Sequence, residues 1–391
     1  MSPWEGRTRR IERPPIAEIN RLAAGLAAEG RDLINLGQAI LALPPPPAAL
    51  TEVERFLAEN EVHGYSPDPG APDVLDAVAA FLREVKSVPA RSEETMLTCG
   101  ANQAYVNALL AISEPGDEIV LLGPYYFDHL FAVELAACKP VVVPLALAKD
   151  RFVLDFDALE KALGPKTRMV TLVSPANPAG MVVPEEDVGR LCRLCNEKGI
   201  WLVSDETYDL LTFPPHRHTS PAALGLHDRV IVLGSFSKTF ALASWRVGYL
   251  WGPGVLADEV VKVQDALVVC APVPSQWAVR GALSDVEGFR SRTMQELTGR
   301  RDALLEAIAR SRSLEPIPPE GATFVLARIR DGRSSFEFSK TLLREAGILS
   351  VPGAAFGPQG EGYVRLSFGN QPADRIREAG ERLVREEWGK E

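Results

Sequence analysis

Short apolar runs alternate with amphipathic stretches through the middle of the chain. Their length and their content of Val, Ile and Leu predict buried strands, and the amphipathic stretches between them predict helices. Several runs are continuously apolar, which is typical of a parallel sheet covered by helices on both faces. We therefore expect an α/β fold with a mostly parallel, seven-stranded sheet sandwiched by helices. The predicted strands are Thr95 to Thr98, Glu118 to Leu122, Val141 to Val143, Met169 to Val173, Trp201 to Val203, Val230 to Leu233 and Val247 to Trp251.

The remaining pattern predicts a smaller α+β domain. A proline run, Pro44 to Pro47, cannot lie inside a helix and marks a boundary. Near the C-terminus a long helix leads into two short strands, Thr323 to Ala327 and Val364 to Phe368. We expect a large domain at residues 45–285 and a small domain made of residues 1–44 and 286–391. The predicted helices are Ile16 to Glu29, Thr51 to Asn60, Asp73 to Glu84, Asn102 to Ile112, Phe127 to Ala137, Phe156 to Leu163, Glu185 to Lys198, Leu256 to Leu267, Ser275 to Leu283, Phe289 to Arg310, Phe336 to Ala346 and Ala373 to Glu387.

Composition narrows the class of protein. At 391 residues the chain exceeds what one hydrophobic core usually supports, so two domains are expected. The net charge of −10 argues against a nucleic-acid partner, and no apolar run is long enough for a membrane span. The basic cluster Arg7, Arg9, Arg10 and Arg13 is expected to be a solvated arm.

The cysteines give no sign of a disulfide framework. There are five, an odd number, and the N-terminus lacks the apolar core of a signal peptide, so we expect reduced thiols and a cytoplasmic protein. Cys192 and Cys195 form a C-x-x-C motif inside a predicted helix. A shared helix face is therefore expected there, and no metal site.

Lys238 is the strongest single candidate for chemistry. It follows a buried strand that ends at Gly234, and Arg246 lies eight residues further on. A lysine in this position suits a carbonyl cofactor, because its amine forms a Schiff base and desolvation with nearby cations keeps it partly unprotonated. Considered alone, a solvated loop lysine is the simpler interpretation. The assignment therefore depends on the other loops.

Three other strand-end loops carry groups that suit a planar, anionic ligand. Gly100, Ala101 and Asn102 open a predicted helix whose exposed amides favour an anion. Tyr126 follows the next strand and is placed to stack on a ring, although packing into the domain is the simpler interpretation. Asn177 lies in an S-P-x-N-P-x-G turn and can hydrogen-bond a ligand oxygen.

The loop after the strand at residues 201–203 carries the charge that a ring nitrogen would need. Asp205 ends this buried strand, where its carboxylate requires a partner such as a protonated pyridine nitrogen. A helix N-cap is the alternative role. Tyr208 offers a phenol to the same ligand. Ser235 and Arg246, on either side of Lys238, suit a phosphate.

Two shorter motifs point elsewhere and are discounted. Ser235-x-x-Lys238 matches the S-x-x-K of serine β-lactamases, but the S-D-N and K-T-G elements of those enzymes do not occur. The stretch from Gly252 to Ala257 fits a loose dinucleotide fingerprint, but it has a proline inside the turn and lacks the expected acidic residue. We interpret it as the entry to a helix.

Taken in order, the motifs resemble those of the class I/II aminotransferases, enzymes of fold type I that use pyridoxal 5′-phosphate. They are G-Y-x-P-x-x-G from Gly64, N-P-x-G from Asn177, D-E-x-Y from Asp205, S-x-S-K from Ser235 and W-R-x-G from Trp245. The resemblance covers nearly the whole chain. It implies an aminotransferase that moves an amino group from an L-amino acid to a 2-oxo acid by a ping-pong route.

The resemblance also implies roles for the cofactor contacts. Lys238 would hold pyridoxal phosphate as an internal aldimine, and Asp205 would pair with its ring nitrogen. Tyr208 and Asn177 would bond the phenolic oxygen of the ring, on whose face Tyr126 would stack. The phosphate contacts would be Ser235, Arg246, Gly100, Ala101 and Asn102.

Substrate and partner contacts follow from the same resemblance. Arg365 would bind the substrate α-carboxylate, beside Gly37 and Asn177. Tyr65 would reach the phosphate of a partner subunit, which implies a homodimer with shared active sites.

The substrate and the reaction type stay open at this point. After Gly37 the chain reads Gln38-Ala39-Ile40-Leu41 in place of the family's more usual acidic and aromatic run. A second arginine for a side-chain carboxylate cannot be placed, which leaves neutral, aromatic and dicarboxylic amino acids open. A lyase (for example a C–S β-lyase), cyclase or oxidase of the same fold would also need Lys238. A non-catalytic regulator would need a DNA-binding module, for which the N-terminal arm looks too short.

Overall fold

The strands of the large sheet direct alternate side chains to two buried faces. In β9 (Val230–Ser235), Val230 and Val232 pack into one hydrophobic cluster, and Ile231 and Leu233 pack into another. The computed structural model describes residues 16–59, 63–226 and 228–385, with Gly6, Thr8 and Ile11. The four arginines of the predicted basic arm and the predicted helix ends Asn60 and Glu387 lie outside the described residues.

The large sheet has seven strands in the order β2-β10-β9-β8-β7-β3-β4. All neighbours are parallel except β10, which runs antiparallel to both β2 and β9. The predicted α/β class with a mostly parallel seven-stranded sheet is therefore confirmed. The other six strands are β2 (Thr95–Thr98), β3 (Glu118–Gly123), β4 (Lys139–Pro144), β7 (Thr167–Val173), β8 (Trp201–Asp205) and β10 (Gly248–Trp251).

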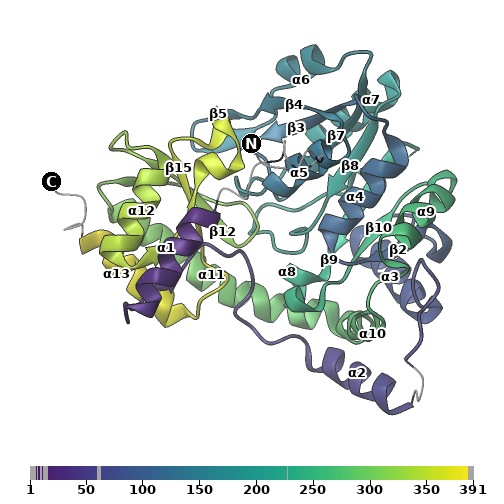
Figure 1. The fold of residues 1–391 in the computed structure, drawn as a ribbon, viewed down its shortest axis with the longest axis horizontal. Coiled ribbons are helices and arrows are strands. Elements are labelled where there is room, and N and C mark those ends of the chain that lie inside the picture. The colour runs from purple at the N-terminus through teal and green to yellow at the C-terminus, as the bar shows by residue number, and fades with distance from the viewer. Residues whose placement is uncertain are drawn as a thin grey trace.

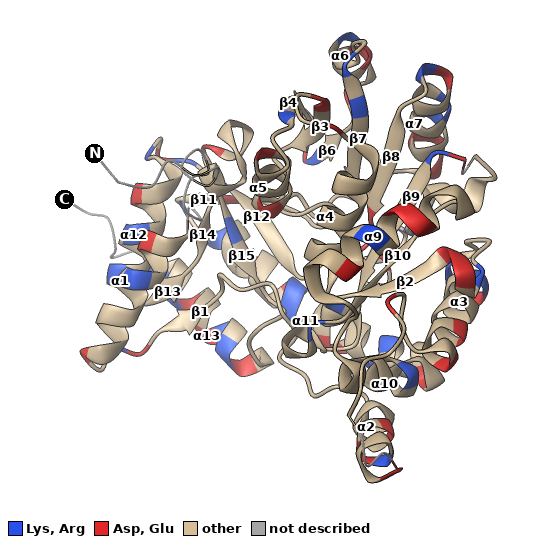
Figure 2. Ribbon diagram, turned by 45° about the vertical axis from the view of Figure 1, so that its right-hand side comes forward, with Lys and Arg blue, Asp and Glu red and all other residues tan. Residues whose placement is uncertain are grey.

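Helices cover both faces of this sheet (Figure 1). One face packs against α2 (Pro47–Glu59), α3 (Pro72–Lys86), α6 (Phe156–Ala162), α7 (Glu185–Lys198) and α10 (Val273–Ala282). The other packs against α4 (Ala101–Ile112), α5 (Phe127–Leu135) and α9 (Ala257–Val268). Most charged residues lie on the helices, while the strands are largely uncharged (Figure 2). Among the described residues, none of the helices combines the length and the apolar character that a membrane span requires.

A smaller α+β unit has its own core. Its antiparallel sheet has the order β11-β12-β15-β14, and its helices are α11, α12 and α13. The purple N-terminal segment in Figure 1 lies beside this unit, because β1 pairs in parallel with β13 and α1 packs on α12. The domain boundaries at residues 45 and 286 stay a prediction. The bounds are α1 (Ala17–Ala28), β1 (Ile34–Asn35), α11 (Val286–Arg310), β11 (Leu314–Ile317), β12 (Phe324–Ile329), α12 (Ser335–Ala346), β13 (Ile348–Leu349), β14 (Val351–Pro352), β15 (Tyr363–Ser367) and α13 (Ala373–Arg385).

Several helix ends differ from the prediction by one to four residues, and two of these differences have a clear physical reason. Helix α2 begins at Pro47 instead of Thr51, because proline is accepted in the first helical turn, where its missing N–H has no partner to lose. Helix α3 continues past Glu84 to Lys86 and ends at a serine, Ser87, in the left-handed conformation (φ 56°). Serine gives no C-cap signal of the kind that glycine gives.

Short elements were missed altogether. The hairpin β5 (Ala146–Ala148) and β6 (Arg151–Val153), like β11, β13 and β14, spans only two to four residues per strand, too few to show an alternating pattern. The C-x-x-C cysteines, Cys192 and Cys195, both lie on the buried face of α7, as predicted.

Candidate active site

A cavity of about 270 Å³ lies beyond the carboxyl ends of the parallel strands, where ligands collect in sheets of this kind. Segments from both sheets and from the N-terminal arm line it. Of the predicted site residues, these line the cavity: Gly37, Ala101, Asn102, Tyr126, Asn177, Asp205, Tyr208, Ser235, Lys238, Arg246 and Arg365.

Lys238 lies in a one-turn helix, α8 (Phe236–Thr239), directly after β9. The hydroxyl of Ser235 caps this turn by accepting a hydrogen bond from the backbone N–H of Ser237 at 3.2 Å. Burial, then the positive charges of Arg365 and Arg246, lower the pKa of Lys238 from 10.5 to about 8. The amine is therefore partly unprotonated near neutral pH, as a nucleophile or base requires.

Asp205, at the end of β8, is 5% exposed, and both of its carboxylate oxygens have polar partners. Its Oδ2 lies 3.1 Å from Nε2 of His129, and its Oδ1 accepts from the backbone N–H (3.0 Å) and the hydroxyl (2.6 Å) of Thr207. Burial opposes ionisation, but His129 and Thr207 outweigh it and hold the pKa of Asp205 below its ordinary value. The ring of Tyr105 stacks on His129 at 4.1 Å and fixes its orientation.

Two phenols, those of Tyr126 and Tyr208, line the cavity. Tyr208 is buried against Phe324, with ring centroids 5.4 Å apart, and burial raises its pKa. The hydroxyl of Tyr126 donates to Oδ2 of Asp128 at 2.6 Å, and Nδ2 of Asn102 donates to the same oxygen at 2.8 Å. Burial and the Asp128 carboxylate raise the pKa of Tyr126, so both phenols stay protonated.

The amide end of α4 forms an anion cradle with Arg246. Gly100 precedes the helix with φ +86°, and a Cβ there would come within 2.8 Å of Nη2 of Arg246. Glycine is therefore required both by the backbone and by the guanidinium. Arg246 is held by the carbonyls of Cys99 and Ala243, at 3.1 Å each.

Arg365 is a buried guanidinium on β15. Its Nη1 donates to Oδ1 of Asn177 at 2.7 Å, and its Nη2 donates to the carbonyl of Gly37 at 2.8 Å. The rings of Phe324 and Phe356 sandwich it, each centroid 4.9 Å from Cζ. The Nε atom has no hydrogen-bond partner among the described residues. A guanidinium that lines the cavity suits an anionic ligand.

Two predicted residues do not line the cavity. Gly100 shapes its wall through the turn before α4. Tyr65 is 83% exposed, in a loop outside the cavity. Gln276 holds that loop by accepting from the backbone N–H of Ala71 at 2.7 Å and donating to the hydroxyl of Ser66 at 3.0 Å.

Sequence reasoning missed several residues at the site. His129 is one of five histidines and lies in the first turn of α5, where nothing local marks it as the partner of Asp205. Thr207 and Ser237 lie within the D-E-x-Y and S-x-S-K motifs, and both line the cavity. Their positions within the motifs were the available signal.

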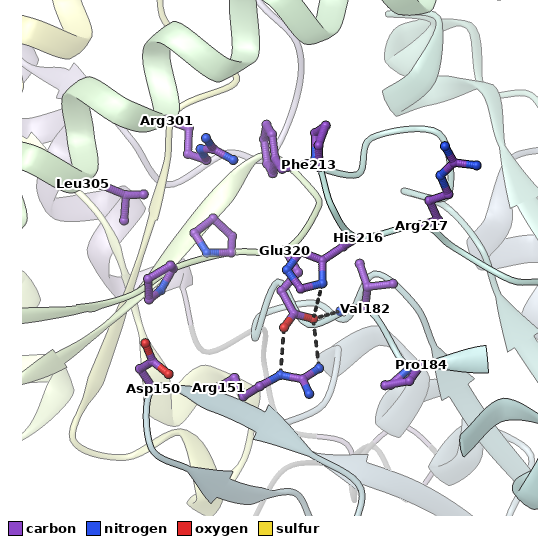
Figure 3. A pocket seen from close by; sticks show the side chains of 13 residues that line it. Asp150, Arg151, Val182, Pro184, Phe213, His216, Arg217, Arg301, Leu305 and Glu320 are labelled. Carbon is purple, nitrogen blue, oxygen red and sulfur yellow. Dashed lines mark hydrogen bonds and ion pairs between the residues drawn. The ribbon is translucent and has the colours of Figure 1, made fainter. Parts of the chain in front are cut away.

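A second cavity, of about 630 Å³, contains none of the predicted residues (Figure 3). Glu320 lies at its centre, where its carboxylate accepts from Nε of Arg151 at 2.8 Å and from the backbone N–H of Val182 at 2.8 Å. The backbone N–H groups of Glu320 and Gly321 also donate to the carbonyl of Gly180. Glu320 thus braces the segment that follows Asn177.

Comparison with known proteins agrees with this arrangement. The model of the family described as aminotransferase class I and II matches residues 31–383. An aromatic aminotransferase from Arabidopsis thaliana is 32% identical over 390 residues, covering 96% of this chain and 94% of that protein. An aspartate aminotransferase from Pyrococcus abyssi is 33% identical over 373 residues, covering 94% of each chain.

Solved structures show the same fold. A double mutant of the Thermus thermophilus aspartate aminotransferase superposes with a TM-score of 0.92 at 30% identity, covering 98% of this chain and 100% of that chain. An aromatic aminotransferase from Pyrococcus horikoshii gives a TM-score of 0.87 at 32% identity, covering 93% and 98%. Because the family match covers residues 31–383, nearly the whole chain, this chain belongs to the aminotransferase class I and II family.

Proposed function

We propose that this pyridoxal-phosphate-dependent aminotransferase holds its cofactor covalently through Nζ of Lys238. It then moves an amino group from an L-amino acid to a 2-oxo acid in a ping-pong cycle. The observation that carries the proposal is an amine whose pKa is lowered to about 8, in one cavity with a buried carboxylate and an anion cradle.

The donor set fits this cofactor. The N-terminal amides of α4, the hydroxyl of Ser235 and the guanidinium of Arg246 suit a phosphate. Asp205, kept ionised by His129 and Thr207, suits a protonated ring nitrogen. When bound, pyridoxal phosphate supplies an electron sink for the electron pair left at the substrate Cα.

Residues of the chain would bind the substrate and transfer the proton. Arg365 would bind the α-carboxylate with its guanidinium and orient the Cα–H bond toward Lys238. Nζ of Lys238 would take the Cα proton as a general base and return it as an acid. Asn177 accepts from Arg365 through Oδ1, so its Nδ2 would donate to the phenolic oxygen of the cofactor. The hydroxyl of Tyr208 would donate to the same oxygen.

The lining favours an uncharged substrate side chain. Within the described residues, the cations that line the cavity are Lys238, Arg246 and Arg365, each assigned above. The residues that follow Gly37 in the lining are apolar apart from one amide, and the lining contains further apolar residues. These residues are Gln38, Ala39 and Ile40, and then Ile16, Phe127 and Val351. We propose apolar or aromatic amino acids as donors in preference to aspartate and glutamate.

We also propose a homodimer with shared sites. The support is Tyr65, which is 83% exposed on a loop held by Gln276 and is available to a second subunit. A tyrosine that is anchored and yet exposed suits an interface. All five cysteines are unpaired, which supports the proposal of a cytoplasmic location.

Cofactor binding and substrate choice are tested together. The purified protein should take up pyridoxal phosphate with a new absorbance band that Lys238→Ala removes and the surface variant Lys262→Ala keeps. Each amino acid is then mixed separately with the loaded enzyme, and loss of the band is followed. Phenylalanine, leucine and methionine should react faster than aspartate. Ammonia and pyruvate released from cysteine derivatives without an oxo acid would contradict transamination.

The shared site is tested by mixing two inactive variants. Lys238→Ala and Tyr65→Ala should each abolish or strongly reduce activity. After subunit exchange, mixed dimers would contain one intact site, so about one quarter of the sites should recover. No recovery, in a mixture shown to contain mixed dimers, would contradict a contribution of Tyr65 to the partner's site.

A further inference from the structure

Lys86 is a buried cation on the far side of the turn that carries Asp205 and Tyr208. It is the last residue of α3, and its side chain is 2% exposed. Its Nζ lies 2.6 Å from Oε2 of Glu206 and 2.5 Å from Oδ2 of Asp209. Each of these carboxylates immediately follows one of the two site residues. The ammonium group therefore joins both ends of the turn from behind.

Both carboxylate oxygens of Glu206 have polar or charged neighbours. Its Oε1 accepts from the hydroxyls of Ser204 at 3.0 Å and Ser220 at 2.7 Å, and its Oε2 lies 3.3 Å from Nε2 of His218. Burial opposes its ionisation, but Lys86 and then His218 hold the pKa of Glu206 well below its ordinary value. Glu206 is thus a fixed buried anion.

Lys86 also contacts β10, which pairs with β9, the strand that leads to Lys238. Its Nζ donates to the hydroxyl of Tyr249 at 2.7 Å. The ring of Tyr249 occupies the space beside Gly234, where a Cβ would come within 2.1 Å of it. Gly234 lies four residues before Lys238, so one ammonium group braces both segments that carry the chemistry.

Stability alone does not account for this arrangement. A buried ion pair often contributes little net stability, because desolvation offsets the attraction between the charges. Burying two carboxylates and one ammonium group removes three charges from water. His218 is a further ionisable neighbour of Glu206. Such a group is better explained by what it orients. Burial would lower the pKa of Lys86, but Asp209 and Glu206 outweigh it and hold that pKa well above its ordinary value.

We infer that Lys86 is a positioning residue for the transfer reaction: it fixes Asp205 and Tyr208 by binding the carboxylates next to them, and it braces the strand before Lys238 through Tyr249. The inference rests on the proposed function of the cavity. It adds a residue that touches neither substrate nor cofactor.

Two variants separate positioning from folding. Lys86→Met removes the charge at similar length and leaves two buried carboxylates uncompensated. Lys86→Met combined with Asp209→Asn returns the buried net charge to its original value but lacks the ammonium bridge. Lys262→Met, an exposed lysine on α9, is the matched control. Four quantities are measured: thermal unfolding without cofactor, the pyridoxal phosphate dissociation constant, the pH titration of the cofactor's absorbance band, and the half-reaction rate constant at cofactor saturation.

Lys86→Met should melt at a lower temperature, bind the cofactor at least about tenfold more weakly, and react about 100-fold more slowly when saturated, because a small misplacement of reacting groups has an effect of this size. The double variant should regain most of the melting temperature that the single variant loses. Its half-reaction rate constant should stay at least about tenfold below that of the wild type, and the pH titration of its cofactor band should stay shifted from that of the wild type. It also keeps the test valid if the single variant fails to fold.

A saturated double variant that reacts within twofold of wild type, with an unchanged band titration, would overturn the inference. In that case the network only stabilises the fold. Failure of the wild-type protein to bind pyridoxal phosphate would instead overturn the proposed function, so the two failures are distinguishable.

Discussion

The low pKa of Lys238 should make the cofactor-free enzyme less stable than a variant without this amine. In the unfolded chain the lysine keeps its proton up to pH 10.5, whereas in the folded chain it loses the proton at about pH 8. Stability therefore rises with pH between these two values and carries the full penalty below them. At 1.36 kcal/mol per pH unit the penalty is about 3 kcal/mol. Water in the cavity screens part of it, so we expect about 2 kcal/mol.

Lys238→Met tests this directly, because methionine keeps the aliphatic packing and removes the charge. Urea unfolding of the cofactor-free proteins at pH 7 should show the variant more stable by about 2 kcal/mol. The advantage should fall to less than half of that at pH 9.5. Other groups titrate over this range, but they do so in both proteins and cancel in the difference. Lys262→Met should show no such trend. Equal stabilities at pH 7, or an advantage independent of pH, would refute the reasoning.

Further substitutions probe the packing and the contacts of the site. Gly234→Ala would place a Cβ 2.1 Å from the ring of Tyr249, and in a melting experiment it should lower the free energy of unfolding by about 3 kcal/mol or more. Gly299→Ala is the control, because Gly299 lies in open space on α11, and this substitution should raise the free energy of unfolding by about 1 kcal/mol. Arg365→Lys should raise KM for the amino acid about 100-fold without removing the cofactor band, because a point charge replaces a planar fork of donors; an unchanged KM would exclude Arg365 as the carboxylate ligand. His129→Leu should weaken cofactor binding about tenfold in an absorbance titration, since Asp205 loses a buried charge-assisted partner, and unaltered binding would contradict that role.

The elements and site residues that could be predicted are those that the local sequence itself marks. The strands around Lys238 and Asp205 are apolar runs that end in short motifs, so local sequence contains both the element and the chemistry. Bringing those motifs into one cavity follows from the parallel order of the strands. Arg365 lies outside the large sheet, and only the family resemblance assigned it a role before the structure placed it beside Asn177.

What could not be predicted depends on contacts that leave no local pattern. Lys86 is 120 residues from Glu206 in sequence and lies beyond the predicted end of its helix, which closes at a serine in a left-handed conformation. His129 and Asp205 are likewise joined only by the packing of α5 against the sheet. The apolar sequence of β10 could not predict its antiparallel direction, because a parallel and an antiparallel strand at this place would both be buried on both faces.

The chemistry of Lys238 also depends partly on a local motif and partly on contacts that are distant in sequence. A motif identifies the lysine, but its pKa depends on the distribution of charge around the cavity. Within the described residues, three cations line this cavity and Asp205 is the single carboxylate that does so. The neighbouring carboxylates, Glu206 and Asp209, point to the opposite side of the turn and are bound by Lys86. If they faced the cavity they would oppose the effect of Arg365 and raise the pKa of the amine. The turn thus keeps negative charge away from Lys238, and Lys86 makes that separation tolerable in a buried environment.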